Sequence, residues 1–336
     1  MTTLTPPFPV VSGTGSEPAT LTPEAGNSTR AKLLPHRIIA IGGGKGGIGK
    51  SILAVSLAIE LARRELRVVL VDCDLGGANL HSLLGIDQPT SSLSDFVLRR
   101  AANLSDLLVP TTVPLLSLIS GARNAIQIAN PLYQQKVRLL RALKKLDADV
   151  LVLDLGAGTH YNVVDFFLLA HHGILVAVPE PTSVENAYRF LKAAFLRWLK
   201  ALDARHEIKD LVQDVARAES LAAITPAELL SAVTRRDAGI GAILAEELAT
   251  FRPLLVVNQV RDTRDLTLGE SMSIASRRLL GIELTYLGHV RYYDQLWRAV
   301  RAHRPLFSDQ LGRPFAADLA AVGGRLLACA RAEDLA

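Results

Sequence analysis

The sequence predicts an α/β fold, a doubly wound, mostly parallel sheet flanked by helices. Three observations support this prediction. Short runs of valine, leucine and isoleucine alternate with stretches of helical apolar spacing. These runs are apolar at nearly every position, as in strands that are covered on both faces. Hydrophobic residues make up 49% of the 336 residues and aromatic residues only 5%, which suits helices packed on a buried sheet.

The predicted strands follow one another through most of the chain. We expect them at residues 37–42, 67–73, 115–119, 149–154, 173–178, 253–258 and 284–290. Helical stretches separate nearly all of them, so the chain consists of repeated βα units. In such sheets, ligands bind beyond the carboxyl ends of the strands, and the functional residues are expected there.

Two segments depart from this alternation. Residues 1–35 are rich in threonine, proline, serine and glycine and show no periodicity, which predicts a disordered tail before a single domain at 36–336. The connection at about 203–250 is too long for a simple loop. Within it, residues 225–228 (TPAE) form a capping box with proline at the first helical position, so we expect a helical insert in the same domain.

Cysteine content and hydropathy exclude several classes of protein. The two cysteines, Cys73 and Cys329, are far apart and form no CxxC motif, which argues against a disulfide framework or an iron–sulfur carrier of the Mrp-like type. No signal peptide opens the chain, and no run of about 18 apolar residues occurs. A soluble, cytoplasmic protein is therefore expected.

One glycine-rich segment matches a phosphate-binding loop. The segment GKGGIGKS fits the pattern G-x-x-x-x-G-K-[ST] and lies between a predicted strand and a predicted helix, as this motif requires. Its backbone N–H groups would surround the β- and γ-phosphate oxygens, Lys50 would bridge those oxygens, and Ser51 would bind Mg²⁺. The predicted nucleotide-binding residues of the loop are Gly44, Lys45, Gly46, Gly47, Ile48, Gly49, Lys50 and Ser51.

Acidic residues end two other apolar strands. Asp72 and Asp74 follow the second predicted strand, and Asp154 ends the fourth. Carboxylates at such buried positions are costly unless they serve a metal, a cation or a water molecule. We expect Asp154 to hold magnesium through its water shell, in the manner of a Walker B acid.

Together these motifs resemble the MinD/ParA family of deviant Walker A ATPases, and within it the FlhG (FleN, YlxH) branch. The resemblance spans about residues 37–200 and 253–307. It rests on KGGIGKS at 45–51, D-x-D-L-G-x-A-N-L at 72–80, D-x-G-A-G at 154–158 and VPEPTSVENAYRFLK at 178–192. It implies a P-loop NTPase that uses ATP and Mg²⁺, hydrolyses ATP slowly and forms a homodimer with ATP.

The resemblance also implies a role for each site residue. Lys45 would be the signature lysine, which reaches across a nucleotide-sandwich dimer to the phosphates bound by the other subunit. Asp74 would be the switch I aspartate that orients the attacking water, with Asp72 as its neighbour near magnesium. Asn258 and Arg261 would contact adenine. The expected catalytic residues are Lys45, Lys50 and Asp74, and the expected metal-site residues are Ser51, Asp72 and Asp154.

The expected function is a switch whose ATP dimer, with a protein partner, positions or regulates a cellular structure such as the flagellum or the division site. Two alternatives remain open. Nine arginines and five acids lie between Arg252 and Arg304, as would suit a ParA-type segregation ATPase that binds non-specific DNA. A metabolic ATP-dependent enzyme of the dethiobiotin-synthetase-like type would share the fold.

The end of the chain bears on peripheral membrane association. Phe315, Leu319, Val322 and Leu326 recur at helical spacing, although Gly323 and Gly324 interrupt them. The pattern fits either a membrane-seeking amphipathic helix or a final helix packed on the sheet.

Overall fold

The computed structural model describes residues 36–74, 77, 79–87, 89–121, 133–206, 225–302, 304–306 and 312–334. The predicted tail at 1–35 and the middle of the connection at 203–250 lie outside these residues.

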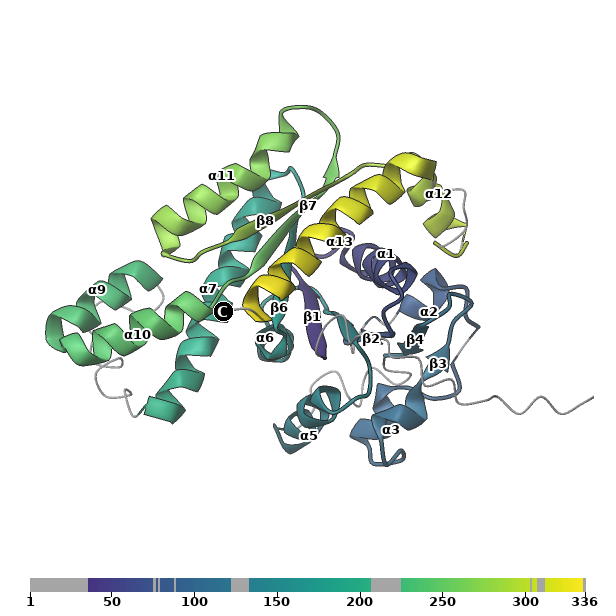
Figure 1. Cartoon of the computed structure of the whole chain (residues 1–336), viewed down its shortest axis with the longest axis horizontal. Helices are drawn as coiled ribbons and strands as arrows, with labels where there is room; N and C mark the ends of the chain where they lie inside the picture. Colours follow the sequence, from purple (N-terminus) through teal and green to yellow (C-terminus); the bar gives the residue numbers. More distant parts are fainter. Residues whose placement is uncertain are drawn as a thin grey trace, which may run out of the picture. The chain divides into compact units, whose positions relative to one another are not determined.

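An eight-stranded sheet forms the centre of the described residues, in the order β3-β4-β2-β5-β1-β6-β7-β8 (Figure 1). Its strands are β1 (Arg37–Gly42), β2 (Val68–Asp72), β3 (Val109–Pro110), β4 (Leu116–Ile119), β5 (Val150–Asp154), β6 (His172–Ala177), β7 (Leu254–Val260) and β8 (Thr285–Arg291). All neighbours are parallel except β3 and β4. The predicted fold class is therefore confirmed. The two-residue β3 was not predicted, because it is too short to show an alternating pattern.

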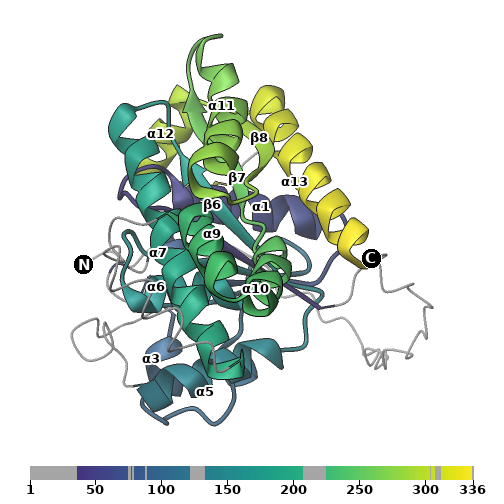
Figure 2. The same cartoon turned by 90° about the vertical axis from the view of Figure 1, so that its left-hand side faces the viewer.

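Helices cover both faces of this sheet, as Figure 2 shows, with α6 and α7 on one side and α1 and α13 on the other. The helices are α1 (Lys50–Arg63), α2 (Leu80–Leu83), α3 (Leu93–Val97), α5 (Tyr133–Lys144), α6 (Tyr161–Leu169), α7 (Pro181–His206), α9 (Pro226–Arg236), α10 (Ala238–Thr250), α11 (Leu268–Ala275), α12 (Asp294–Arg301) and α13 (Gly312–Asp334). Short 3₁₀ turns lie at Leu104–Leu107 and Asp265–Thr267, and a π-helical turn at Ser276–Leu280. Successive strand residues such as Ile38 and Ile39 enter opposite apolar clusters, which explains why the strands are apolar throughout.

The helices α9 and α10 pack on the main core. Leu229, Val233 and Leu244 are buried in the same apolar cluster as α6 and α7. Thr225 caps α9: its hydroxyl accepts a hydrogen bond from the backbone N–H of Glu228, whose carboxylate accepts one from the N–H of Thr225. The described part of the insert therefore extends one face of the sheet and shares its core.

The C-terminal helix α13 packs against α1 and β8. Four of its apolar residues are between 1% and 6% exposed and belong to the cluster that contains α1; they are Phe315, Leu319, Val322 and Leu326. Arg64, directly after α1, donates to the carbonyl oxygen of Ala320 at 2.8 Å, and Arg325 donates to that of Leu287 at 2.7 Å. These apolar side chains are thus part of the core and form no membrane-seeking face. None of the described helices combines the length and apolar character needed to cross a membrane.

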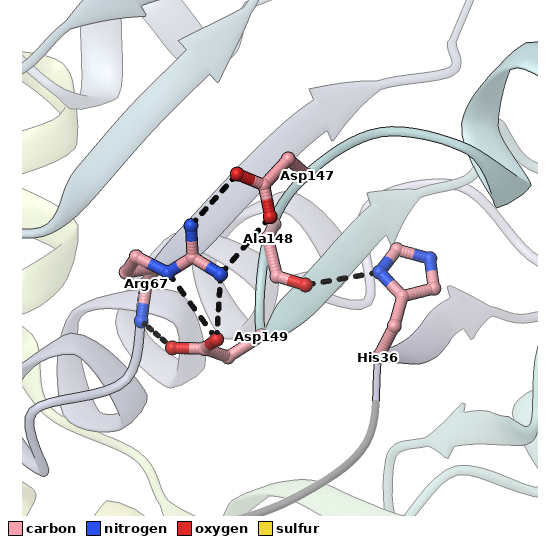
Figure 3. A network of polar contacts seen from close by, with 5 residues as sticks. All are labelled: His36, Arg67, Asp147, Ala148 and Asp149. Atoms are coloured by element: carbon pink, nitrogen blue, oxygen red, sulfur yellow. Dashed lines mark hydrogen bonds and ion pairs between the residues drawn. The ribbon is translucent and has the colours of Figure 1, made fainter. Parts of the chain in front are cut away.

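A polar network joins the amino ends of the strands (Figure 3). The guanidinium of Arg67 donates to Asp147 at 3.0 and 3.1 Å and to Asp149 at 3.0 Å, and its backbone N–H donates to Asp149 at 2.8 Å. A ring nitrogen of His36 lies 3.0 Å from the carbonyl oxygen of Ala148. This network ties the starts of β1, β2 and β5 together at the end opposite the glycine-rich loop.

Candidate nucleotide-binding site

The glycine-rich loop turns back from β1 into α1 and needs glycine for two different reasons. Gly47 and Gly49 have φ values of 75° and 84°, in the left-handed region that favours glycine. Gly44 has no room for a side chain, because a Cβ atom there would lie 2.2 Å from the carbonyl oxygen of Asn186 in α7. Gly46 is open, with only the Cβ of Ala157 at 3.8 Å. The loop is thus held against α7 while its tip faces outward.

Lys50, the first residue of α1, points back into this loop. Its side chain is buried, and its Nζ donates a hydrogen bond to the carbonyl oxygen of Lys45 at 3.1 Å. Burial lowers the pKa of Lys50, while the charges of Asp154 and Asp74 oppose the shift. A buried cation at the N-terminus of a helix, beside a glycine-rich loop, suits a polyphosphate ligand.

Asp72 shapes the turn after β2. Its carboxylate accepts hydrogen bonds from the backbone N–H groups of Asp74 at 3.1 Å, Asn79 at 3.0 Å and Leu80 at 3.3 Å. Burial raises the pKa of Asp72 to about 7, although these hydrogen bonds oppose the shift. Asp72 thereby fixes the segment that carries Asp74 and begins α2.

Asp154 offers the atom that a metal ion would need. It lies directly opposite Asp72 in the pairing of β5 with β2. Burial raises the pKa of Asp154 to about 8, which the hydrogen bond from the Ser51 side chain opposes. Its Oδ1 is buried and has no hydrogen-bond partner in the described part of the molecule. An oxygen in this state next to a serine hydroxyl fits a divalent cation or its bound water.

The acids do not make a complete metal cage. Within the described ranges, no three His, Cys, Asp or Glu side chains are grouped as a metal site. Mg²⁺ commonly takes one or two protein oxygens and completes its shell with water and substrate phosphates. The arrangement of Ser51 and Asp154 therefore fits a magnesium ion that arrives with a nucleotide.

Lys45 is held at the surface, away from the phosphate pocket of its own loop. Its Nζ lies 2.8 Å from Oε2 of Glu180 and 3.2 Å from the hydroxyl of Thr182, at the start of α7. The side chains of Lys45 and Glu180 are 38% and 56% exposed. The two lysines of the loop therefore face different surroundings.

A cavity of about 420 Å³ opens over the loop. Its lining includes Gly46, Gly47, Gly49, Lys50, Ser51, Asp74 and Asn79. Trp297 and Val300 of α12 and Arg304 just after it line the same cavity. The sequence did not predict Arg304, which lies about 250 residues from the loop and belongs to no recognisable motif.

The residues expected at the adenine end lie at the carboxyl end of β7 and directly after it. Asn258 is buried, and its side-chain nitrogen donates to the carbonyl oxygen of Ile48 at 2.8 Å, which holds the loop in place. The guanidinium of Arg261 lies 4.0 Å from the ring centroid of Tyr292. Arg261 and Tyr292 line a second cavity of about 570 Å³, together with Tyr293. The structure thus brings Asn258 to the loop and places Arg261 at a neighbouring aromatic hollow.

Several arginines between Arg252 and Arg304 lie next to acidic side chains in the structure. Four of the nine arginines in this range form ion pairs with nearby acids: Arg264 with Asp262, Arg277 with Glu283, Arg291 with Asp318 and Arg298 with Asp294. These pairs locally offset part of the positive charge that would attract nucleic acid.

Comparison with known proteins agrees with this geometry. The ParA family model, described as NUBPL iron-transfer P-loop NTPase, matches residues 35–198. The chain is 38% identical over 162 residues to the antiactivator FleN of Pseudomonas aeruginosa, covering 47% of this chain and 56% of FleN. It is 31% identical over 157 residues to the septum site-determining protein MinD of Synechocystis, covering 46% of this chain and 58% of that MinD. The matches therefore span about half the length of these relatives.

Solved structures show the same fold. The septum site-determining protein MinD complexed with Mg-ADP from Pyrococcus horikoshii aligns with a TM-score of 0.60 at 18% identity, over 87% of this chain and 96% of that one. The cell division ATPase MinD of Pyrococcus furiosus aligns with a TM-score of 0.59 at 20% identity, over 89% of this chain and 99% of that one. With the loop, the acids and the strand order arranged as described, the chain belongs to the MinD/ParA family of P-loop NTPases.

Proposed function

We propose that this protein is an ATPase that binds Mg·ATP, forms a homodimer in the ATP state and acts as a switch that positions or regulates a cellular structure. The observation that supports this proposal most directly is the location of Lys45. One lysine of the loop, Lys50, points into the phosphate pocket, whereas Lys45 is tied to Glu180 and Thr182 at the surface. A surface cation on a phosphate loop is available to the nucleotide of a second subunit.

Releasing Lys45 requires little free energy. Its ion pair with Glu180 is partly exposed, and exposed ion pairs contribute about 1 kcal/mol or less. A triphosphate carries more negative charge and more acceptor oxygens than one carboxylate, so it attracts a lysine more strongly than Glu180 does. The triphosphate of a second subunit would therefore compete well with Glu180, and loss of the γ-phosphate would weaken that competition. This difference is what a nucleotide-dependent switch needs.

The remaining site residues have complementary roles. Magnesium, when bound with the nucleotide, would neutralise charge on the phosphate oxygens. Ser51 and Asp154 would hold it, and Asp72 would keep the neighbouring turn in shape. Asp74 lines the cavity and would orient the attacking water. A Cβ atom at Gly156 would lie 3.2 Å from Oδ1 of Asp74, so this glycine leaves space for that carboxylate.

The names of the relatives support a proposal for the biological setting. FleN is named an antiactivator and MinD a septum site-determining protein. We therefore infer a regulatory role in placing a flagellum or a division site. This role would be exerted through a protein partner at the inner face of the cell membrane. Four C-terminal arginines are paired with acidic side chains, which makes a role in DNA segregation the weaker alternative. Binding to DNA that falls steeply with salt would revive it.

The test is the mass of the protein in solution with Mg·ATP and with Mg·ADP, measured by light scattering after size exclusion. We expect a dimer only with Mg·ATP, and a longer-lived dimer for Asp74→Ala. Lys45→Ala should bind ATP and remain monomeric, whereas Lys50→Ala should not bind nucleotide. A wild-type protein that stays monomeric under every condition would contradict the switch and favour a metabolic ATP-dependent enzyme of the dethiobiotin-synthetase-like type.

A further inference from the structure

We propose that Arg304 is a further phosphate-binding residue, which contacts the nucleotide held by its own subunit. This inference rests on the proposed function, because it takes Mg·ATP as the ligand of the cavity. It adds a cation from the C-terminal part of the chain to a phosphate and metal site whose predicted loop residues and acids lie between Gly44 and Asp154. The supporting observations are the position of Arg304, its anchoring and its charge.

The backbone at Arg304 is fixed on both sides. Its own N–H donates to the carbonyl oxygen of Ala299 in α12 at 2.9 Å, and the N–H of Leu306 donates to the carbonyl oxygen of Leu83 in α2 at 3.0 Å. Pro305, between these two residues, packs closely on Gly85: a Cβ atom at Gly85 would lie 2.4 Å from the proline ring. The segment 304–306 is thus attached to α12 and to α2, and the cavity above the phosphate loop lies between these helices.

No acidic side chain among the described residues pairs with Arg304. Its guanidinium forms no ion pair or hydrogen bond within the described residues, unlike the four C-terminal arginines that pair with acids. Lys50 and Asp74 line the same cavity. A planar guanidinium matches two phosphate oxygens at once and stays ionised at every physiological pH. A triphosphate is therefore the ligand that this cation suits.

The same anchoring connects Arg304 to the turn after β2. Leu80, the first residue of α2, donates its N–H to Asp72 at 3.3 Å, and α2 holds the segment 304–306 through Leu83 and Gly85. A phosphate contact at Arg304 would thus join that turn, α2 and α12 around one nucleotide. We expect the surroundings of α12 to change when nucleotide binds.

The fluorescence of Trp297 can report nucleotide binding in this test. Of the two tryptophans of the chain, Trp297 lines the cavity and is 51% exposed, whereas Trp198 is 9% exposed in the core. Nucleotide binding should therefore alter the emission of Trp297. Titrations of the 336-residue chain with Mg·ATP and Mg·ADP, followed by this emission and in parallel by calorimetry, give the two affinities.

We would compare Arg304→Gln with Arg301→Gln and with Arg304→Lys. Arg301 is the matched control, because it is exposed at the end of α12, three residues before Arg304, and does not line the cavity. Arg304→Gln should weaken Mg·ATP binding about tenfold or more, the usual effect of losing a charge-assisted phosphate contact. Arg304→Lys should restore part of the affinity, and Arg301→Gln should bind like wild type. A larger loss for Mg·ATP than for Mg·ADP would place the contact at the γ-phosphate.

The outcomes separate this inference from the proposed function. If wild type does not bind Mg·ATP, the proposed function itself is wrong. If wild type binds and both glutamine variants bind equally well, Arg304 is not a phosphate ligand while the proposed function stands. Thermal unfolding without nucleotide identifies a folding defect in Arg304→Gln. In that case Arg304→Met decides, because methionine keeps much of the length of the side chain and lacks its charge, and unchanged Mg·ATP affinity in this variant would overturn the inference.

Discussion

The phosphate loop of this protein is held against α7 by a contact that leaves no room for a side chain, and Gly44→Ala tests it. A Cβ atom at this position would lie 2.2 Å from the carbonyl oxygen of Asn186, whereas ordinary contacts begin at 3.4 Å. The loop and α7 would have to separate by about 1 Å, the difference between these distances. Forcing extra volume into a packed contact destabilises proteins by about 1–3 kcal/mol. We expect that loss in the free energy of unfolding.

Two neighbouring glycines provide matched controls. Gly47 has a φ of 75°, and a Cβ atom there would meet nothing within 4 Å, so Gly47→Ala should cost only the left-handed strain of about 1–2 kcal/mol. Gly46 has no positive φ and meets only Ala157, at 3.8 Å. Gly46→Ala should therefore be neutral, or more stable by about 0.4–1 kcal/mol, because alanine restricts the unfolded chain.

The assay is urea unfolding without nucleotide, followed by circular dichroism, so that phosphate contacts do not enter the comparison. We expect the stability of Gly46→Ala to equal or exceed that of wild type, and those of Gly44→Ala and Gly47→Ala to fall below it. With Mg·ATP added, Gly44→Ala should also bind nucleotide more weakly, because the loop is displaced from α7. Equal destabilisation by Gly46→Ala and Gly44→Ala would refute the idea that contact with α7 decides the effect.

Three further predictions concern other parts of the molecule. Asp149→Ala should lower the free energy of unfolding by about 1–3 kcal/mol, because the backbone N–H of Arg67 loses its acceptor. Calorimetry should show unchanged ATP affinity for this variant, because the network lies at the end of the strands opposite the glycine-rich loop. Asn258→Ala should weaken Mg·ATP and Mg·ADP binding equally in the same assay, since the carbonyl oxygen of Ile48 loses the hydrogen bond that holds the loop. Burial lowers the pKa of His172 to about 4, so the unfolded chain binds the extra proton between pH 6.5 and 4, and stability is lost as pH falls through this range. Between pH 6.5 and 4, the free energy of unfolding of wild type should fall by about 1.4 kcal/mol per pH unit more than that of His172→Leu. Urea unfolding at several pH values measures both, and an equal dependence on pH in the two proteins would contradict this prediction.

The parts of the site that are local in the chain could be predicted from the sequence. An apolar strand, glycines at fixed spacing and an amphipathic helix predict β1, the phosphate loop and α1, because backbone geometry and periodicity act over a few residues. The same holds for the capping box at the start of α9. The sequence also predicted that Asp72 and Asp154 end buried strands. It did not show that they lie opposite each other, which depends on β2 and β5 being neighbours.

The roles of residues far apart in the chain depended on tertiary packing. The spacing of Phe315 and Leu319 suited a membrane-seeking face as well as a core face, and packing against α1 assigned them to the core. Lys45 has a surface partner, and Arg304 lines the phosphate cavity, because α7 and α12 are brought to the loop by the order of the strands. Periodicity encodes which face of an element is apolar, whereas the partner of that face depends on how all the elements pack together, and this information is spread over the whole chain.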